Sequence, residues 1–140
     1  MLKAKLNLKT IQLINLFEKI TRVKAKYCFD YNGITIFVVP KTLLNKALGK
    51  NAENLNKLKT QLNKKIRIIT SPTNIRDAEN FIKSIVFPYE IKKIDIQNNE
   101  LYIFSAPGNK AALIGRNKSR LIELSDIIEK FFGIKKVVIK

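Results

Sequence analysis

Two short stretches carry residue types suited to holding an anion. Gly49-Lys50-Asn51 and Gly115-Arg116-Asn117 each place a glycine before a cation and an amide, and an apolar residue precedes each glycine. Glycine allows a sharp turn and the close approach of another backbone, while the free amides at the start of a following helix are anion donors. Both stretches therefore predict a glycine turn between two helices that can bind a phosphate.

The two stretches belong to a longer segment that occurs twice, 66 residues apart. The segment 48–55 returns as 114–121, and a leucine-periodic amphipathic run follows each copy. The 140-residue chain is therefore interpreted as a duplication of two units, each of roughly 65 residues, near the lower size at which a domain folds alone. The one clear break is Ser71-Pro72-Thr73-Asn74, which predicts domains at 1–71 and 72–140.

The composition argues against an enzyme. The chain has one cysteine, no histidine and no tryptophan, so a disulfide framework and a Cys/His metal site are excluded. Cys28 lies between Tyr27 and Phe29, where a small buried hydrophobe is expected rather than a reactive thiol. The acids show no paired-carboxylate spacing, and there is no Walker-type loop or dinucleotide fingerprint. We therefore expect no catalysis, no cofactor and no small-molecule substrate.

The charge predicts a polyanionic partner. The net charge is +16, with 15 Lys/Arg against 3 Asp/Glu in residues 1–70 and 12 against 8 in residues 71–140. Nucleic acid is the commonest soluble polyanion. Richness in Lys, Asn and Ile is also typical of an AT-rich genome, which is an alternative source of part of the lysine excess. The sequence shows no membrane-spanning stretch and no signal-peptide core, so a cytoplasmic location without membrane contact is expected.

Periodicity in the first half predicts the elements that position the first turn. We expect a helix over about 10–20, then two antiparallel strands over 23–30 and 34–39 joined by the hairpin signal Asn32-Gly33. A short helix over 42–48 leads into the turn. The helix after the turn and the last strand are marked by Leu55, Leu58, Leu62 and the run 66–69.

The second half repeats this order. The expected elements are a helix from about Asp77 to Pro88, strands before and after Asn98-Asn99, a short helix over 110–114, a long helix capped by Gly133 and a strand over 137–139. Each half thus runs helix, strand, strand, helix, turn, helix, strand. Four aromatic side chains in this half sit at core spacing and are interpreted as core rather than base-stacking residues: Tyr102, Phe104, Phe131 and Phe132.

An αββααβ unit with a glycine turn between its central helices is the type II K-homology (KH) arrangement, and the chain resembles the archaeal NusA-like transcription factors, which consist of two tandem KH domains. The resemblance covers essentially the whole chain. It is carried, in order, by Leu16-Phe17-Glu18-Lys19, Cys28, Ile36-Phe37-Val38-Val39, Lys46-Ala47-Leu48-Gly49-Lys50, Phe81-Ile82-Lys83-Ser84-Ile85, Pro88 and Phe132-Gly133-Ile134-Lys135-Lys136-Val137-Val138-Ile139. The implied fold class is α/β, of the α+β sandwich type, with helices on one face of a three-stranded sheet in each domain.

The resemblance also implies where RNA binds. The KH loop has the form Gly-x-x-Gly and grips four single-stranded nucleotides beside an apolar groove. By resemblance, Ala52 and Lys118 stand where the second glycine is expected. Alanine disfavours positive φ and weakens the close approach, whereas Lys118 adds a phosphate-seeking charge. The implied RNA-binding set is Lys46, Gly49, Lys50, Asn51, Ala52, Lys57, Gly115, Arg116, Asn117, Lys118 and Arg120.

Two functions remain open at this point. The resemblance implies a single-stranded RNA-binding factor of transcription termination or antitermination that acts with RNA polymerase. The alternative is a non-enzymatic assembly protein of the ribosome or another ribonucleoprotein, whose degenerate loops do not grip RNA. A lysine run after the first loop also has two interpretations, a solvated helix face or an extended phosphate track: Lys57, Lys59, Lys64 and Lys65.

Overall fold

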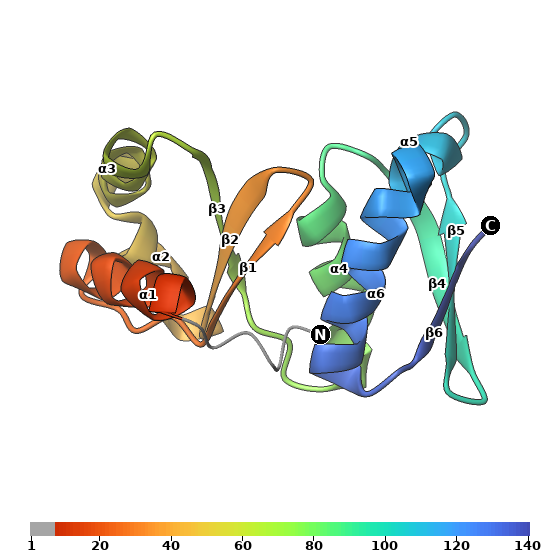
Figure 1. Ribbon diagram of the computed structural model, residues 1–140. Coiled ribbons are helices and arrows are strands. Elements are labelled where there is room, and N and C mark those ends of the chain that lie inside the picture. The colour runs from red at the N-terminus through yellow and green to blue at the C-terminus, as the bar shows by residue number, and fades with distance from the viewer. Residues whose placement is uncertain (1–7) are drawn as a thin grey trace. The chain divides into compact units, whose positions relative to one another are not determined.

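The computed structural model describes residues 8–140, which form two compact units that divide between Ser71 and Pro72 (Figure 1). Each unit contains three helices and a three-stranded sheet in the order α, β, β, α, α, β, with short 3-10 turns between them. The predicted fold class, a mixed α and β architecture of the tandem KH type, is confirmed.

The elements of the first unit follow the predicted order. They are α1 (Leu8–Thr21), β1 (Tyr27–Tyr31), β2 (Ile34–Val39), a 3-10 turn (Lys41–Leu43), α2 (Leu44–Leu48), a 3-10 turn (Lys50–Ala52), α3 (Glu53–Leu62) and β3 (Lys65–Thr70). The first strand begins at Tyr27 and not near Val23, although Val23 and Ala25 are buried with the alternation that the sequence shows.

The first sheet has the order β1-β2-β3, with β1 antiparallel and β3 parallel to the central β2. Asn32 and Gly33 both have positive φ, 53° and 75°, which is the two-residue hairpin geometry that the Asn-Gly pair predicts. The core on the helical face is built on Phe17 and Phe37, whose stacked ring centroids lie 4.5 Å apart, and on the fully buried Leu58 of α3. Burial of Leu58 therefore fixes the helix that leaves the first glycine turn.

The second unit repeats these elements. They are a 3-10 turn (Ile75–Asp77), α4 (Ala78–Val86), β4 (Ile91–Gln97), β5 (Glu100–Ser105), α5 (Lys110–Ile114), a 3-10 turn (Arg116–Lys118), α6 (Ser119–Phe132) and β6 (Lys136–Ile139). The sheet order is β4-β5-β6, antiparallel and then parallel. Figure 1 shows α4 and α6 together on one face of this sheet.

Of the four aromatic residues expected in the core of the second unit, two pack there. The rings of Phe131 and Phe132 pack on Phe81 of α4, with centroid distances of 4.6 Å and 6.0 Å. The interpretation of Tyr102 and Phe104 as core residues is wrong. Their rings lie on the face of β5 away from the helices, because their neighbours Leu101 and Ile103, each 0% exposed, take the helical face and side chains alternate along a strand.

Cys28 is a packed hydrophobe, as predicted. It is partly buried against the first core, and burial, with a smaller contribution from Asp30, raises the pKa of its thiol to about 12. The thiolate that reactive cysteines need is therefore scarce at neutral pH. Within residues 8–140, no helix has the length and hydropathy to cross a membrane, and no three potential ligand side chains gather into a metal site.

Candidate nucleic-acid interface

The two glycine turns have the same backbone conformation. Gly49 has φ 78° and ψ 171°, and Gly115 has φ 78° and ψ 169°. The third positions are also left-handed, with φ 54° and ψ 32° at Asn51 and φ 55° and ψ 31° at Asn117. Asparagine tolerates this region better than most residues do. The loop shape is therefore a property of the repeat and does not depend on the residues that differ between its copies.

The fourth position stays left-handed without its glycine. Ala52 has φ 59° and ψ 30°, and Lys118 has φ 61° and ψ 22°. Each loop is closed by a backbone hydrogen bond of 3.1 Å, which Ala52 donates to the carbonyl of Gly49 and Lys118 donates to the carbonyl of Gly115. The loop therefore keeps its conformation without the second glycine, and the residue that replaces this glycine is strained.

The first glycine is required by space as well as by its positive φ. A Cβ at Gly49 would lie 2.9 Å from Cγ of Asn54, and a Cβ at Gly115 would lie 2.9 Å from Cγ and from the backbone nitrogen of Arg120. Distances this short are not found for real Cβ atoms. The side chain at the sixth loop position thus occupies the volume that the glycine leaves open.

That sixth side chain reaches back across the turn in both units. Asn54 Nδ2 donates to the carbonyl of Lys46 at 3.3 Å, and Arg120 Nη1 donates to the carbonyl of Ala112 at 2.6 Å. We call this contact the loop clasp, since it ties the helix after the turn to the helix before it. The Arg120 guanidinium also lies 5.3 Å from the ring centroid of Tyr89. Arg120 is therefore engaged within its own unit.

The remaining cations of the predicted set face solvent. Lys50 lies in the first loop, and Arg116 and Lys118 lie in the second, all with exposed side chains. Lys46 is exposed on α2, close before Gly49, and Lys57 is exposed on the second turn of α3. A phosphate approaching either loop from solvent thus meets at least one ammonium or guanidinium group.

A shallow hollow of about 570 Å³ extends from the first loop along α3. It brings Asn51 and Lys57 together with four polar side chains that follow one face of the helix: Glu53, Asn56, Thr60 and Gln61. Lys64 instead points to the sheet, because its Nζ lies 3.5 Å from Oγ1 of Thr35. The lysine run is therefore divided, and only Lys57 of its four members lines the hollow.

The helix starts beside the two loops differ in charge. Neither α3 nor α6 has a side-chain cap on its first amides. Glu53 lies in the first turn of α3, whereas the first turn of α6 carries no acid. An anion is attracted by the positive end of a helix dipole and repelled by a carboxylate there. The second loop, with Arg116 and Lys118, is electrostatically the better anion site of the two.

Sequence reasoning placed Arg120 in the RNA-binding set but missed Asn54 and Tyr89, and it missed the hydrogen bond by which the sixth residue holds each loop. Asn54 and Arg120 are separated by the repeat interval, but their types differ so much that comparing the copies does not reveal a shared role. Tyr89 was not singled out, since it lies far from the loop in sequence. The signal in the sequence is a side chain with a hydrogen-bond donor at the sixth loop position of both copies.

Comparison with known proteins gives three similarities. "Probable transcription termination protein NusA" of Thermoplasma acidophilum is 26% identical over 135 residues, covering 94% of this chain and 92% of that protein. The protein of the same description from Methanococcus vannielii is 29% identical over 140 residues, covering 97% of this chain and 79% of that protein. A solved structure described as "Crystal structure of APE1850" matches 96% of this chain with a TM-score of 0.67 and 25% identity. No protein-family model matches.

Proposed function

We propose that the chain, which is similar to proteins described as probable NusA in two archaea, is a single-stranded RNA-binding factor of transcription termination or antitermination that acts through two KH-type units. The named relatives support the transcriptional role, since both are described as probable transcription termination proteins. The net charge of +16 supports a polyanionic ligand. RNA and RNA polymerase are the proposed partners.

The observation that carries the proposal is the shared conformation of the two loops. Gly49 and Gly115 open the same turn, and each is followed by an exposed cation, Lys50 or Arg116. In the KH mode of binding, this loop clamps the backbone of single-stranded RNA while the bases lie in the adjacent groove. Lys50 and Arg116 are assigned to phosphate contacts, and Lys118 adds a second cation at the second loop.

The test replaces the variable pair of each loop with acids. The variants are Lys50→Asp with Asn51→Asp, and Arg116→Asp with Asn117→Asp. For single strands, log K falls with log salt by about 0.7 per neutralised phosphate, so loss of one loop should flatten the slope by roughly one to two units. We expect the second pair to weaken binding of a U-rich or A-rich oligonucleotide more, since α6 begins without an acid.

A matched control places the same charge change on another element. Arg76→Asp with Asn80→Asp alters two exposed residues, one in the 3-10 turn before α4 and one in the first turn of α4. It should leave the salt slope close to that of the wild type, while circular dichroism verifies the fold of all three variants. If both double variants of the loops remain folded and bind RNA as the wild type does, the loops do not grip RNA. The alternative function, an assembly protein of a ribonucleoprotein, then explains the chain better.

A further inference from the structure

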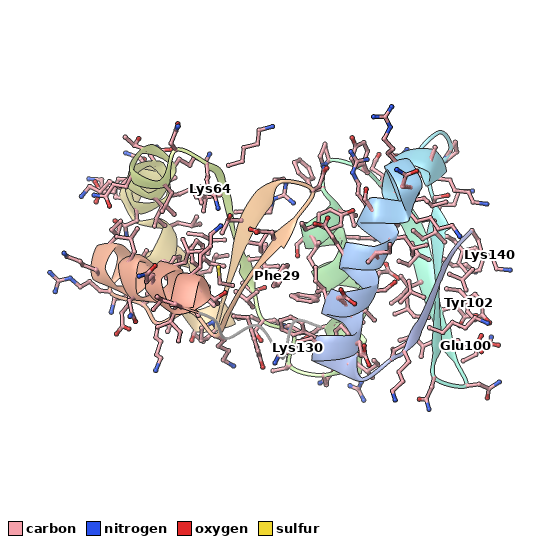
Figure 2. The ribbon with its side chains drawn as sticks, viewed as in Figure 1. Phe29, Lys64, Glu100, Tyr102, Lys130 and Lys140 are labelled. Carbon is pink, nitrogen blue, oxygen red and sulfur yellow. The ribbon has the colours of Figure 1, made fainter. Side chains whose placement is uncertain are left out.

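The sheet of the second unit exposes two aromatic rings on the face away from its helices. Tyr102 and Phe104 are two residues apart on the central strand β5, so their rings lie on the same face, about 7 Å apart along the strand. Figure 2 shows Tyr102 there with Glu100 and Lys140. Within the described part of this unit, the helices pack only on the opposite face, which is lined by Leu101 and Ile103.

Two lysines lie over these rings, one on the neighbouring strand β4 and one directly after the neighbouring strand β6. Lys93 is paired in register with Phe104, and its Nζ lies 5.0 Å from the ring centroid. From the other side, Lys140 Nζ lies 5.5 Å from the ring centroid of Tyr102. We call these four residues, Lys93, Tyr102, Phe104 and Lys140, the aromatic face. It combines flat apolar surface with cations, the two properties that single-stranded nucleic acid requires.

The two carboxylates beside the aromatic face have partners of their own. Glu100 accepts a hydrogen bond from the Tyr102 hydroxyl and lies 3.7 Å from Lys136 Nζ. The hydrogen bond holds the ring orientation, and it is the main reason that the pKa of Tyr102 is raised. Asp95 accepts a hydrogen bond of 2.9 Å from Gln97. Lys93 and Lys140 are the cations whose ammonium groups lie over the rings.

The aromatic face is specific to the second unit. At the repeat interval, the first unit has the aliphatic residues Ile36 and Val38 in place of Tyr102 and Phe104. A feature inherited only from the ancestral repeat would be expected in both copies. The partly exposed aromatic pair is therefore a difference that arose between them.

We propose that the aromatic face is a second RNA-binding surface, on which bases of single-stranded RNA stack on Tyr102 and Phe104 while Lys93 and Lys140 contact the phosphates. The ligand class rests on the proposed function. The surface is separate from the glycine loops, because it lies on the sheet strands and not between the central helices of the unit. Sheet faces bearing two or three aromatic residues bind single-stranded RNA in this way in other folds.

Stacking of a base on either ring is more favourable than the cation–π contact that a lysine makes with that ring. An exposed cation–π contact changes an equilibrium constant by about two- to fivefold, whereas stacking of a base on an aromatic ring changes it by about five- to a hundredfold. A base can therefore displace each ammonium from its ring. The displaced ammonium remains beside the base, where the phosphates of the strand lie.

The test removes the rings without changing charge. Tyr102→Thr with Phe104→Thr retains side chains that favour strands, and it should weaken binding of a U-rich 12-nucleotide RNA by about tenfold or more with an unchanged salt slope. The exchange variant Tyr102→Phe with Phe104→Tyr keeps both rings and should bind within about twofold of the wild type. As a second measurement, RNA should quench the tyrosine fluorescence of the wild type more than that of the single variant Tyr102→Phe.

The outcomes separate this proposal from the proposed function. If the threonine pair binds RNA as the wild type does while the loop variants bind weakly, the aromatic face does not bind RNA and the loops do. Equal quenching in the wild type and in Tyr102→Phe overturns the proposal even if the threonine pair fails to fold. If the wild-type protein binds no single-stranded RNA, the proposed function and this inference both fail.

Discussion

Ala52 holds a backbone conformation that its side chain disfavours. Its φ of 59° lies in the left-handed region, which costs an L-residue with a Cβ roughly 1–2 kcal/mol. We predict that Ala52→Gly raises the free energy of unfolding by about 0.5–1 kcal/mol, because relief of this strain exceeds the entropy that glycine adds to the unfolded chain. Chemical denaturation of the full chain measures the change.

The chain provides a control for this substitution with the opposite expected sign. Ala111 is an exposed residue of α5 in a right-handed conformation, so Ala111→Gly should lower the free energy of unfolding by about 0.5–1 kcal/mol. A loss of stability in both variants would show that the loop at Ala52 is not strained.

Residue types alone did not settle which side chains of β5 face the core. Residues 101–104 read Leu-Tyr-Ile-Phe, so both phases of the alternation are apolar and either could be buried. The helices select Leu101 and Ile103, whose compact side chains fill the interior at 0% exposure. The tertiary packing of α4 and α6, which local periodicity does not describe, therefore decides the role of Tyr102 and Phe104.

At the scale of elements, the clasp joins the helices on the two sides of each turn. Arg120→Ala removes the donor to the Ala112 carbonyl, whereas Arg120→Asn introduces the side chain that makes the equivalent bond at Asn54. We predict that the alanine variant speeds hydrogen exchange of the Lys118 amide, which closes the loop, and that the asparagine variant keeps most of its protection. Nuclear magnetic resonance without RNA measures both.

The same two variants show whether Arg120 also contacts RNA. If its guanidinium serves only the clasp, Arg120→Asn keeps the salt slope of RNA binding. A slope reduced by about 0.7 in the asparagine variant would instead place the guanidinium on a phosphate. Loss of Lys118 protection in both variants to the same extent would show that the hydrogen bond to Ala112 is not what holds the loop.

Most element positions followed from the sequence because their signals are local. Asn32-Gly33 specifies a hairpin, Gly133 ends α6 at φ 70°, and the helix predicted over 110–114 has those bounds in the structure. The start of β1 was not found, because residues 23–25 alternate in burial as a strand does but lie outside the paired register of β1 and β2. Alternation reports which side is buried, whereas a strand also needs a partner.

At the scale of the whole molecule, charge is the dominant feature, and it is unevenly distributed. The first half carries most of the excess, while the second has the loop with two exposed cations and no acid at the following helix start. A high net charge attracts any polyanion, so charge alone does not distinguish single-stranded RNA from a duplex. Discrimination has to come from contacts that only unstacked bases can make.

We predict that single-stranded RNA is preferred over duplex DNA of the same length, and that the preference grows with salt. Duplex binding by charge alone weakens by about 0.9 in log K per phosphate for each tenfold rise in salt, against about 0.7 for a single strand. Base stacking adds salt-insensitive affinity that a closed duplex cannot gain. Competition of labelled single-stranded RNA with each polymer, at about 50 and 200 mM salt, measures the preference. Equal competition by the duplex at both concentrations would show a nonspecific polycation, because attraction to phosphates would then account for all of the binding.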